Sequence, residues 1–256
     1  MLNQFTPLIL TFNEAPNIGR VLDRLAWAKR IVVVDSYSDD ETAAIAERYP
    51  NVAFYRRRFD SHANQWNFGL RETAIDTEWV LALDADYVVP DSLVAELRTL
   101  DPLADIVGYR ASFRYCVEGI PLTGTVYTPV TVLFRREQAA YAQRGHTQRV
   151  QVSGTVAMLR SLIHHDDRKP LERWFASQVK YMQLEAAALL GTPMEKLDIP
   201  DKVRRLVLVA PLAMFVYCLV VKLAILDGRR GLLYACQRAL AETILSLFLL
   251  QGILKR

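Results

Sequence analysis

Two carboxylates one residue apart follow an apolar segment, and this spacing could bind a metal ion. The segment Trp79-Val80-Leu81-Ala82-Leu83 is typical of a strand buried on both faces, and Asp84 and Asp86 come directly after it. In an extended chain, residues i and i+2 point to the same side, so both carboxylates can face one cation. Such oxygen ligands suit Mg²⁺ or Mn²⁺, which in turn hold substrate phosphates. The alternative is that Asp86 begins a turn and Asp84 caps a nearby group.

Two other predicted strands also end in polar or acidic residues. The apolar segment 7–12 leads into Asn13 and Glu14, and the segment 31–34 leads into Asp35. Helical patterns separate these strands, which predicts an α/β fold with a mostly parallel sheet flanked by helices. Ligands of such sheets bind outside the carboxyl ends of the strands. We therefore expect the three strand ends to converge on one crevice.

A nicotinamide-dependent dehydrogenase is one candidate for this fold class. The distance of Asp35 from the first strand-to-helix turn suits the ribose-binding acid of such enzymes. That turn contains no glycine, however, so the backbone cannot approach a pyrophosphate closely. We favour a nucleotide held through its base and ribose at Asp35, with its diphosphate held through a cation at Asp84 and Asp86.

Four motifs, in this order and at this spacing, carry a family resemblance: Leu10-Thr11-Phe12-Asn13-Glu14, Val33-Val34-Asp35-Ser36-x-Ser38-x-Asp40-x-Thr42, Gln65-x-Asn67-x-x-Leu70 and Leu83-Asp84-Ala85-Asp86. Together they resemble the donor half of family 2 glycosyltransferases with the GT-A fold. The branch most resembled contains bacterial lipopolysaccharide-core glucosyltransferases. The resemblance covers roughly the first 190 residues and continues weakly beyond them.

The resemblance implies a hexosyltransferase that uses a nucleotide-diphosphate sugar, with a UDP-sugar favoured, and depends on Mg²⁺ or Mn²⁺. It implies that Asp86 is the main metal ligand and that Asp84 meets the ribose or the metal. Glu14 could instead serve only a helix N-terminus, and the glutamine and asparagine of the third motif could be an exposed helix face. The nucleotide-sugar pocket implied by the resemblance consists of Thr11, Asn13, Glu14, Asp35, Gln65, Asn67 and Asp84.

The catalytic base is less clearly marked than the donor site. Inverting transfer needs a general base that takes the proton of the acceptor hydroxyl. Related chains often have His-Glu near the acceptor site, whereas this chain has His146 followed by Thr147, and it has Tyr87 where Glu often follows the second Asp. His146 is one candidate base, and Asp166 or Asp167 is another if that segment folds back over the site. A nucleotide-sugar-binding scaffold that has lost catalysis is the open alternative.

The segment His164-His165-Asp166-Asp167 could indicate a metal-dependent hydrolase, but few histidines remain elsewhere to supply further ligands. One histidine that completes the metal site at Asp86 fits better, and His164 is the candidate. The alternative is that both histidines cap the next helix. A nucleotidyltransferase, which also uses paired acids and a metal, is disfavoured because no glycine-rich basic loop follows the first strand.

The C-terminal part of the chain is apolar and basic. We predict a GT-A domain over residues 1–195 and a membrane-associating helical region over 196–256. From Pro200 onward nine residues are Lys or Arg and three are Asp or Glu, which favours an anionic membrane over nucleic acid. Segments 206–226 and 232–254 are mostly apolar, and they could form a membrane-spanning hairpin, lie in the interface, or pack as a soluble helical pair that covers the sheet or dimerises. Basic residues flank the first segment on both sides, which favours shallow insertion.

These features predict where the protein works. The N-terminus has no basic segment followed by an apolar one, so we expect the catalytic part at the cytoplasmic face of the bacterial inner membrane, peripheral or monotopic. The expected acceptor is a lipid-linked or lipopolysaccharide-type glycan, and a homo-oligomer is possible. The three cysteines, expected to be reduced and buried, are Cys116, Cys218 and Cys236.

Overall fold

The computed structural model describes residues 2–144 and 147–255. The chain forms two compact units, Met1–Gly119 with Tyr127–Arg168, and Ile120–Val126 with Lys169–Arg256. The sequence suggested a boundary after residue 195. Helix α5 (Leu171–Gly191), which that boundary assigned to the catalytic domain, lies in the second unit.

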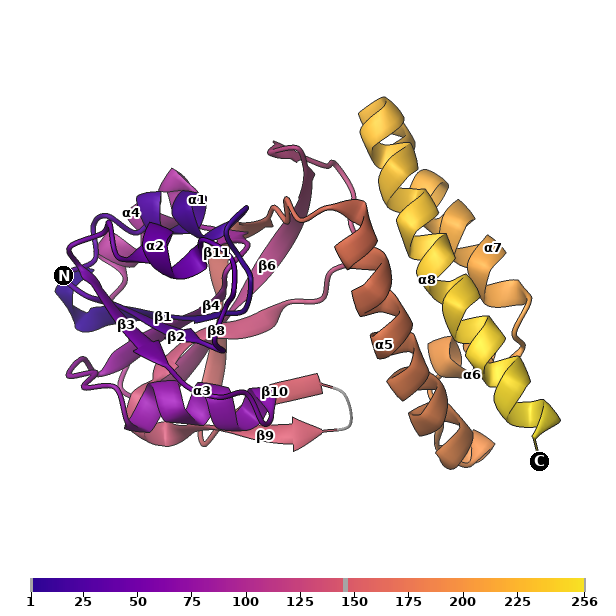
Figure 1. Cartoon of the computed structure of the whole chain (residues 1–256), viewed down its shortest axis with the longest axis horizontal. Coiled ribbons are helices and arrows are strands. Elements are labelled where there is room, and N and C mark those ends of the chain that lie inside the picture. The colour runs from indigo at the N-terminus through magenta and orange to yellow at the C-terminus, as the bar shows by residue number, and fades with distance from the viewer. Residues whose placement is uncertain (1, 145–146, 256) are drawn as a thin grey trace. The chain divides into compact units, whose positions relative to one another are not determined.

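The first unit alternates strands and helices around one large sheet (Figure 1). The strand order is β3-β2-β1-β4-β8-β6-β11-β5. Strand β1 runs parallel to β2 and β4, β2 runs parallel to β3, and β6 runs parallel to β11. Strands β9 and β10 form a separate antiparallel pair. The predicted α/β fold with a mostly parallel sheet is therefore confirmed. The elements of this unit are η1 (Leu2–Gln4), β1 (Phe5–Thr11), α1 (Ile18–Asp23), β2 (Ile31–Asp35), α2 (Thr42–Ala46), β3 (Val52–Arg56), α3 (His62–Arg71), β4 (Trp79–Asp84), β5 (Tyr87–Val88), α4 (Asp91–Thr99), β6 (Ile106–Val117), β8 (Val130–Arg135), η2 (Arg136–Gln138), β9 (Ala139–Arg144), β10 (Thr147–Val152) and β11 (Thr155–His165).

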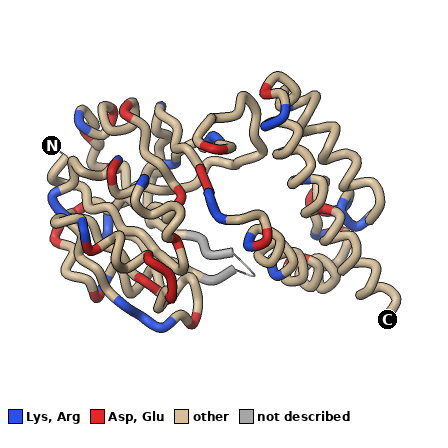
Figure 2. The backbone as a smooth tube through the Cα atoms, turned by 45° about the horizontal axis from the view of Figure 1, so that its top comes forward, with Lys and Arg blue, Asp and Glu red and all other residues tan. Residues whose placement is uncertain are grey.

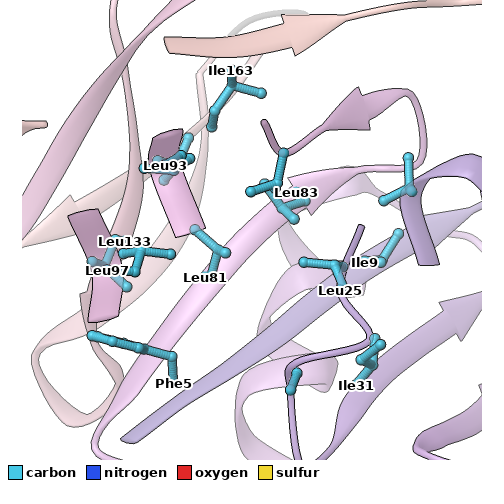
Figure 3. Packing of buried hydrophobic residues seen from close by; sticks show 14 of the residues in the cluster. Phe5, Ile9, Leu25, Ile31, Leu81, Leu83, Leu93, Leu97, Leu133 and Ile163 are labelled. Atoms are coloured by element: carbon cyan, nitrogen blue, oxygen red, sulfur yellow. The ribbon is translucent and has the colours of Figure 1, made fainter. Parts of the chain in front are cut away.

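The central strands are apolar throughout because both faces of the sheet are covered. Alternate residues of β1 pack into different clusters, since Ile9 belongs to the cluster with α1 and α4, whereas Leu8 packs with α3. Figure 3 shows the first cluster, in which side chains of β1, β4 and α4 meet. The registers of β1 with β2 and of β1 with β4 place the polar carboxyl ends of these strands at one edge of the sheet.

The second unit is helical. Val207 and Leu223 both adopt left-handed backbone conformations, with φ of 64° and 59°. They interrupt the apolar segment 206–226, so this segment does not form the single helix that a spanning hairpin requires. One helical stretch of the described residues, Ala224–Leu254, is long and apolar enough to cross a membrane by length and composition. The other elements are β7 (Ile120–Pro121), η3 (Met194–Lys196), α6 (Ile199–Arg205), α7 (Val209–Val216), the π-helical turn η4 (Tyr217–Val221), η5 (Ala224–Asp227) and α8 (Gly228–Leu254).

The start of α8 depends on a glycine. A Cβ atom on Gly231 would lie 1.7 Å from the backbone oxygen of Ala224, so the Gly231→Ala variant must separate η5 from α8. We expect this variant to lower the free energy of unfolding by about 1–3 kcal/mol, measured by denaturant titration of the helical signal. Gly191→Ala is the matched control, because no atom lies within 4 Å of its added methyl group. Equal stability of the two variants would contradict this packing.

The cysteines differ in exposure. Cys116 and Cys218 are buried, as predicted, whereas Cys236 is exposed, so the expectation of three buried thiols is wrong for Cys236. Burial raises the pKa of the Cys116 thiol to about 11, and the charge of Asp166 adds to this rise. Cys116 is therefore a thiol at neutral pH and has little reactivity.

Candidate active site

The carboxyl ends of three strands meet at one edge of the sheet. Strand β1 lies between β2 and β4, and the registers pair Thr11 with Asp35 and Leu10 with Asp84. The polar ends of β1, β2 and β4 therefore converge, as the sequence predicted. A cavity of about 560 Å³ lies at the opposite edge, where its lining includes Phe5 of β1 and Val52 of β3. We assign it no ligand, because ligands of such sheets bind at the carboxyl ends.

Asp35 anchors the loop that follows β2. Its carboxylate accepts hydrogen bonds from Thr11 Oγ1 at 2.8 Å, from Ser38 N at 2.8 Å and from Ser38 Oγ at 2.5 Å. Asp35 is only 1% exposed. A carboxylate has about four acceptor positions, so these three donors leave about one for a further partner.

The loops after β1 and β2 are joined into one wall. Asn13 has a left-handed φ of 56°, donates its backbone N–H to Ser38 Oγ at 2.8 Å and accepts from Asp39 N at 2.9 Å. Glu14 donates its backbone N–H to Thr42 Oγ1 at 2.8 Å. These contacts hold the two loops in a fixed relative position at the sheet edge.

Asp86 lies beside a histidine of β11. His165 pairs with Tyr87 in the β11–β5 ladder, and its Nε2 lies 3.2 Å from Asp86 Oδ2. The structure thus places His165, rather than the predicted His164, against Asp86. Neighbouring residues of a strand face opposite sides, so the register of β11 decides which histidine reaches the site.

Three tyrosine rings surround the His165 imidazole. Their centroids lie 5.4 Å (Tyr87), 5.2 Å (Tyr115) and 5.0 Å (Tyr127) from that of His165. Burial lowers the pKa of His165, but the adjacent Asp86 carboxylate more than offsets this, so the pKa lies above its ordinary value. Its Nδ1 is buried and makes no hydrogen bond within the part of the chain that the structure describes. The ring is therefore held by packing and by Asp86.

The donor set fits a divalent cation that also binds substrate oxygens. Among the described residues, no group of three or more His, Cys, Asp or Glu side chains could enclose a metal ion. Mg²⁺ is commonly held by one or two carboxylates, with substrate phosphates and water supplying its other ligands. Asp84 and Asp86 are the carboxylates that would hold such an ion, and His165 stands next to Asp86.

Comparison with known proteins identifies the family. Residues 8–166, more than half of the chain, match the model described as "Glycosyl transferase family 2". The chain belongs to glycosyltransferase family 2.

The chain is also similar to individual known proteins. The chain is 32% identical over 133 residues to the lipopolysaccharide core biosynthesis glycosyltransferase LpsC of Rhizobium meliloti (strain 1021), over 50% of this chain and 47% of LpsC. The match thus spans about half of that relative. The crystal structure of S. aureus TarS 1-349 in complex with UDP-GlcNAc shares the fold, with a TM-score of 0.50, 14% identity, and coverage of 98% of this chain and 92% of TarS 1-349. A glucosyl-3-phosphoglycerate synthase from Mycobacterium tuberculosis, solved with Mn²⁺, UDP and phosphoglyceric acid, has a TM-score of 0.48, 16% identity, and coverage of 74% of this chain and 79% of that chain.

In this family 2 chain, the polar residues of α3 make internal contacts. Gln65 is 1% exposed, donates to Ser36 Oγ at 3.0 Å and to the Arg57 carbonyl at 3.1 Å, and accepts from Arg57 Nη1 at 2.7 Å. Asn67 donates to the Tyr141 carbonyl and accepts from the Tyr141 N–H, both at 2.9 Å. The alternative of an exposed helix face is therefore wrong for Gln65, whose amide supports the loop after β2. Asn67 fastens β9 to α3.

Asp166 lies in a buried ion-pair network. Its carboxylate pairs with Arg20, accepts from Arg168 Nε at 2.9 Å and accepts from Gly119 N at 3.0 Å. Burial raises the pKa of Asp166. The hydrogen bond from Arg168 and the charge of Arg20 lower it, and together with the Gly119 N–H they outweigh burial, so the pKa of Asp166 lies below its ordinary value. A carboxylate so strongly paired is a weak base, and this geometry disfavours the predicted catalytic role of Asp166.

Asn17 is a residue that sequence reasoning missed. It is 0% exposed, and its amide nitrogen donates to Glu14 Oε2 at 2.8 Å and to Asp167 Oδ1 at 2.9 Å. Its oxygen accepts from Arg168 N and from Arg20 Nη2, both at 2.8 Å. All four hydrogen-bonding positions of the amide are thus used. In the sequence Asn17 looks like an ordinary residue at a helix start, and only the long-range contacts reveal that it joins the loop after β1 to the end of β11.

The predicted base His146 lies outside the described residues. The acceptor base therefore stays a prediction.

Proposed function

We propose that this protein is an inverting, metal-dependent hexosyltransferase that moves a sugar from a UDP-sugar to a lipid-linked or lipopolysaccharide-type acceptor. The observation that carries the proposal is the position of Asp84 and Asp86 at the carboxyl end of β4, with His165 3.2 Å from Asp86, beside the joined loops after β1 and β2. The named activity of LpsC supports the acceptor class, and the UDP-GlcNAc complex of TarS 1-349 supports the donor class. We place the reaction at the cytoplasmic face of the inner membrane.

In the proposed reaction, a base takes the proton of the acceptor hydroxyl, whose oxygen attacks the anomeric carbon of the sugar. The bond from that carbon to the diphosphate oxygen breaks, and the nucleoside diphosphate leaves with the bonding electrons. When bound, a divalent cation would supply positive charge to the leaving diphosphate. Asp84 and Asp86 would hold that cation, with His165 beside Asp86, and the tyrosines around His165 keep its ring in place.

The nucleotide pocket is proposed to lie against the wall formed by the loops after β1 and β2. Asp35 contributes its remaining acceptor position and holds Ser38, which in turn holds Asn13. Thr11, Glu14 and Gln65 support the same wall through Asp35, Thr42 and Ser36. The amide of Asn67 is used in hydrogen bonds to the backbone of β9. Its assignment to the pocket therefore depends on the position of α3 rather than on a direct contact with the nucleotide. His146 is the proposed base.

Calorimetric titration with UDP tests the donor site. We expect UDP to bind in the presence of Mn²⁺ and to bind at least about tenfold more weakly without it, because a divalent cation would offset the repulsion between the diphosphate and the two carboxylates. GDP under the same conditions is the control for the nucleotide base. Equal UDP binding with and without Mn²⁺ would contradict metal dependence, and no binding of any nucleotide would contradict the donor site.

A second candidate is a nucleotide-sugar-binding scaffold without catalysis. It is favoured by the ion pairs that occupy Asp166, because they remove one of the candidate bases. Such a protein would bind UDP with Mn²⁺ but would neither transfer nor hydrolyse the sugar of a UDP-sugar. Slow hydrolysis of a radiolabelled UDP-sugar by the purified chain would exclude it.

A further inference from the structure

The second unit exposes large apolar side chains on one segment. Between residues 206 and 226, the exposed fraction reaches 76% at Leu208 and 72% at Leu212. Residues 206–221 include no Lys, Arg, Asp or Glu. Figure 2 shows correspondingly long stretches of this unit without charged residues. We call the exposed set the apolar face: Leu206, Leu208, Val209, Leu212, Val216, Tyr217, Val220, Val221, Leu223, Ile225 and Leu226.

The side chains of this segment that point inward are smaller. Val207, Ala210, Cys218 and Ala224 are each 7% exposed or less. Helix α7 packs on α8 through this side, and Ser246 Oγ of α8 donates to the Val207 carbonyl at 2.5 Å. Small residues inside and large apolar residues outside reverse the usual arrangement of a soluble helix pair and are typical of helices that face lipid.

The interior of the same unit holds ionised groups. Arg204 of α6 lies 3.0 Å from Glu242 of α8, 3.0 Å from Asp201 and 3.6 Å from Glu185 of α5. The Glu242 side chain is 4% exposed. This cluster lies near the middle of α8, and charged groups at the centre of a bilayer are costly. The cluster therefore favours a unit that lies at the membrane surface over one in which α8 crosses the membrane.

Basic residues stand at one end of the apolar face. Lys222 lies between Val221 and Leu223 of this face, and Arg229 and Arg230 are exposed at the start of α8. The nearby acid, Asp227, accepts hydrogen bonds from Thr123 N and Thr123 Oγ1, both at 2.8 Å. The end of the face is therefore net positive, which complements anionic lipid headgroups.

We infer that the apolar face inserts into one leaflet of an anionic membrane, with Lys222, Arg229 and Arg230 at the headgroups. The helical stretch Val209–Val221 is shorter than the roughly 20 residues that cross a bilayer, so it enters from one side and leaves on the same side. The inference adds to the proposed membrane location the surface by which the chain attaches, and it does not depend on sugar transfer being the activity.

Vesicle flotation tests the inference. The full chain is made by cell-free synthesis with vesicles of phosphatidylcholine, either alone or mixed with phosphatidylglycerol. We expect the chain to float with both and more completely with the anionic vesicles. The double variant Leu212→Ser with Val220→Ser removes two large side chains from the face, and we expect its partition coefficient to fall by about tenfold or more. Leu103→Ser is the matched control, since Leu103 is 70% exposed in the first unit; it is expected to float like the unmodified chain.

Other outcomes would overturn the inference. If the full chain stays unbound with every vesicle, or if the double variant floats like the unmodified chain, the face does not insert. A stable dimer in sedimentation, dissociated by the double substitution and unaffected by vesicles, would assign the face to a second copy. Titration of the double variant with UDP separates this test from the proposed function, because the substitutions lie outside the donor site.

Discussion

Asp86→Asn is expected to reduce sugar transfer by about 10²–10³-fold while the protein stays folded. The substitution keeps the size of the side chain but removes the charge that faces His165 and would hold the cation. The leaving diphosphate then lacks positive charge at the point where its own negative charge develops. Transfer from a radiolabelled UDP-sugar is measured together with Mn²⁺-dependent binding of UDP, and both are expected to fall.

The matched control is Asp76→Asn, an exposed aspartate that lines the cavity at the opposite edge of the sheet. It should leave transfer and binding unchanged. If Asp86→Asn keeps full transfer while its circular dichroism matches the unmodified chain, Asp86 is not the cation ligand. If UDP binding persists and only transfer is lost, Asp86 acts on the reacting groups rather than in donor binding.

Asp166→Ala is expected to lower the free energy of unfolding by about 3 kcal/mol. The substitution leaves Arg20, Arg168 and the Gly119 N–H without their shared acceptor. The loss is smaller than for a fully enclosed pair, because the side chains of Arg20 and Arg168 are 32% and 29% exposed and can be rehydrated. Denaturant titration measures the effect. Asp91→Ala is the control, because Asp91 also pairs with an arginine but its side chain is 93% exposed, and its loss should cost less than about 1 kcal/mol.

The contribution of Asp166 should also depend on pH in a defined direction. Its pKa is lowered in the folded protein, so the unfolded chain binds the proton more readily and the stabilisation is complete above about pH 4. The stabilisation is lost as the pH falls through the folded pKa, and the stability difference between the unmodified chain and Asp166→Ala should shrink there. A loss of transfer beyond about 10³-fold in a folded Asp166→Asn variant would instead restore Asp166 as the base.

The choice between His164 and His165 shows where sequence reasoning stops. Both histidines precede the same two aspartates, and nothing local to the motif tells which one faces Asp86. The pairing of His165 with Tyr87 in the β11–β5 ladder settles it. Asp166 is a similar case, since its two arginine partners come from residues 20 and 168, and the contact with Arg20 closes only when α1 and β11 pack together.

The sequence by itself determined the fold class and the donor edge of the site. Apolar strands followed by Asn13, Asp35 and Asp84 and separated by helical patterns are typical of parallel βαβ units, and parallel neighbours bring their carboxyl ends together. The tertiary structure decided which side chains are free for chemistry. It joined Asp35 to Ser38, enclosed Asp166 between arginines, and broke segment 206–226 at two left-handed residues. The physical reason is that periodicity and composition report local burial, whereas the partner of a polar group comes from anywhere in the chain and exists only after packing.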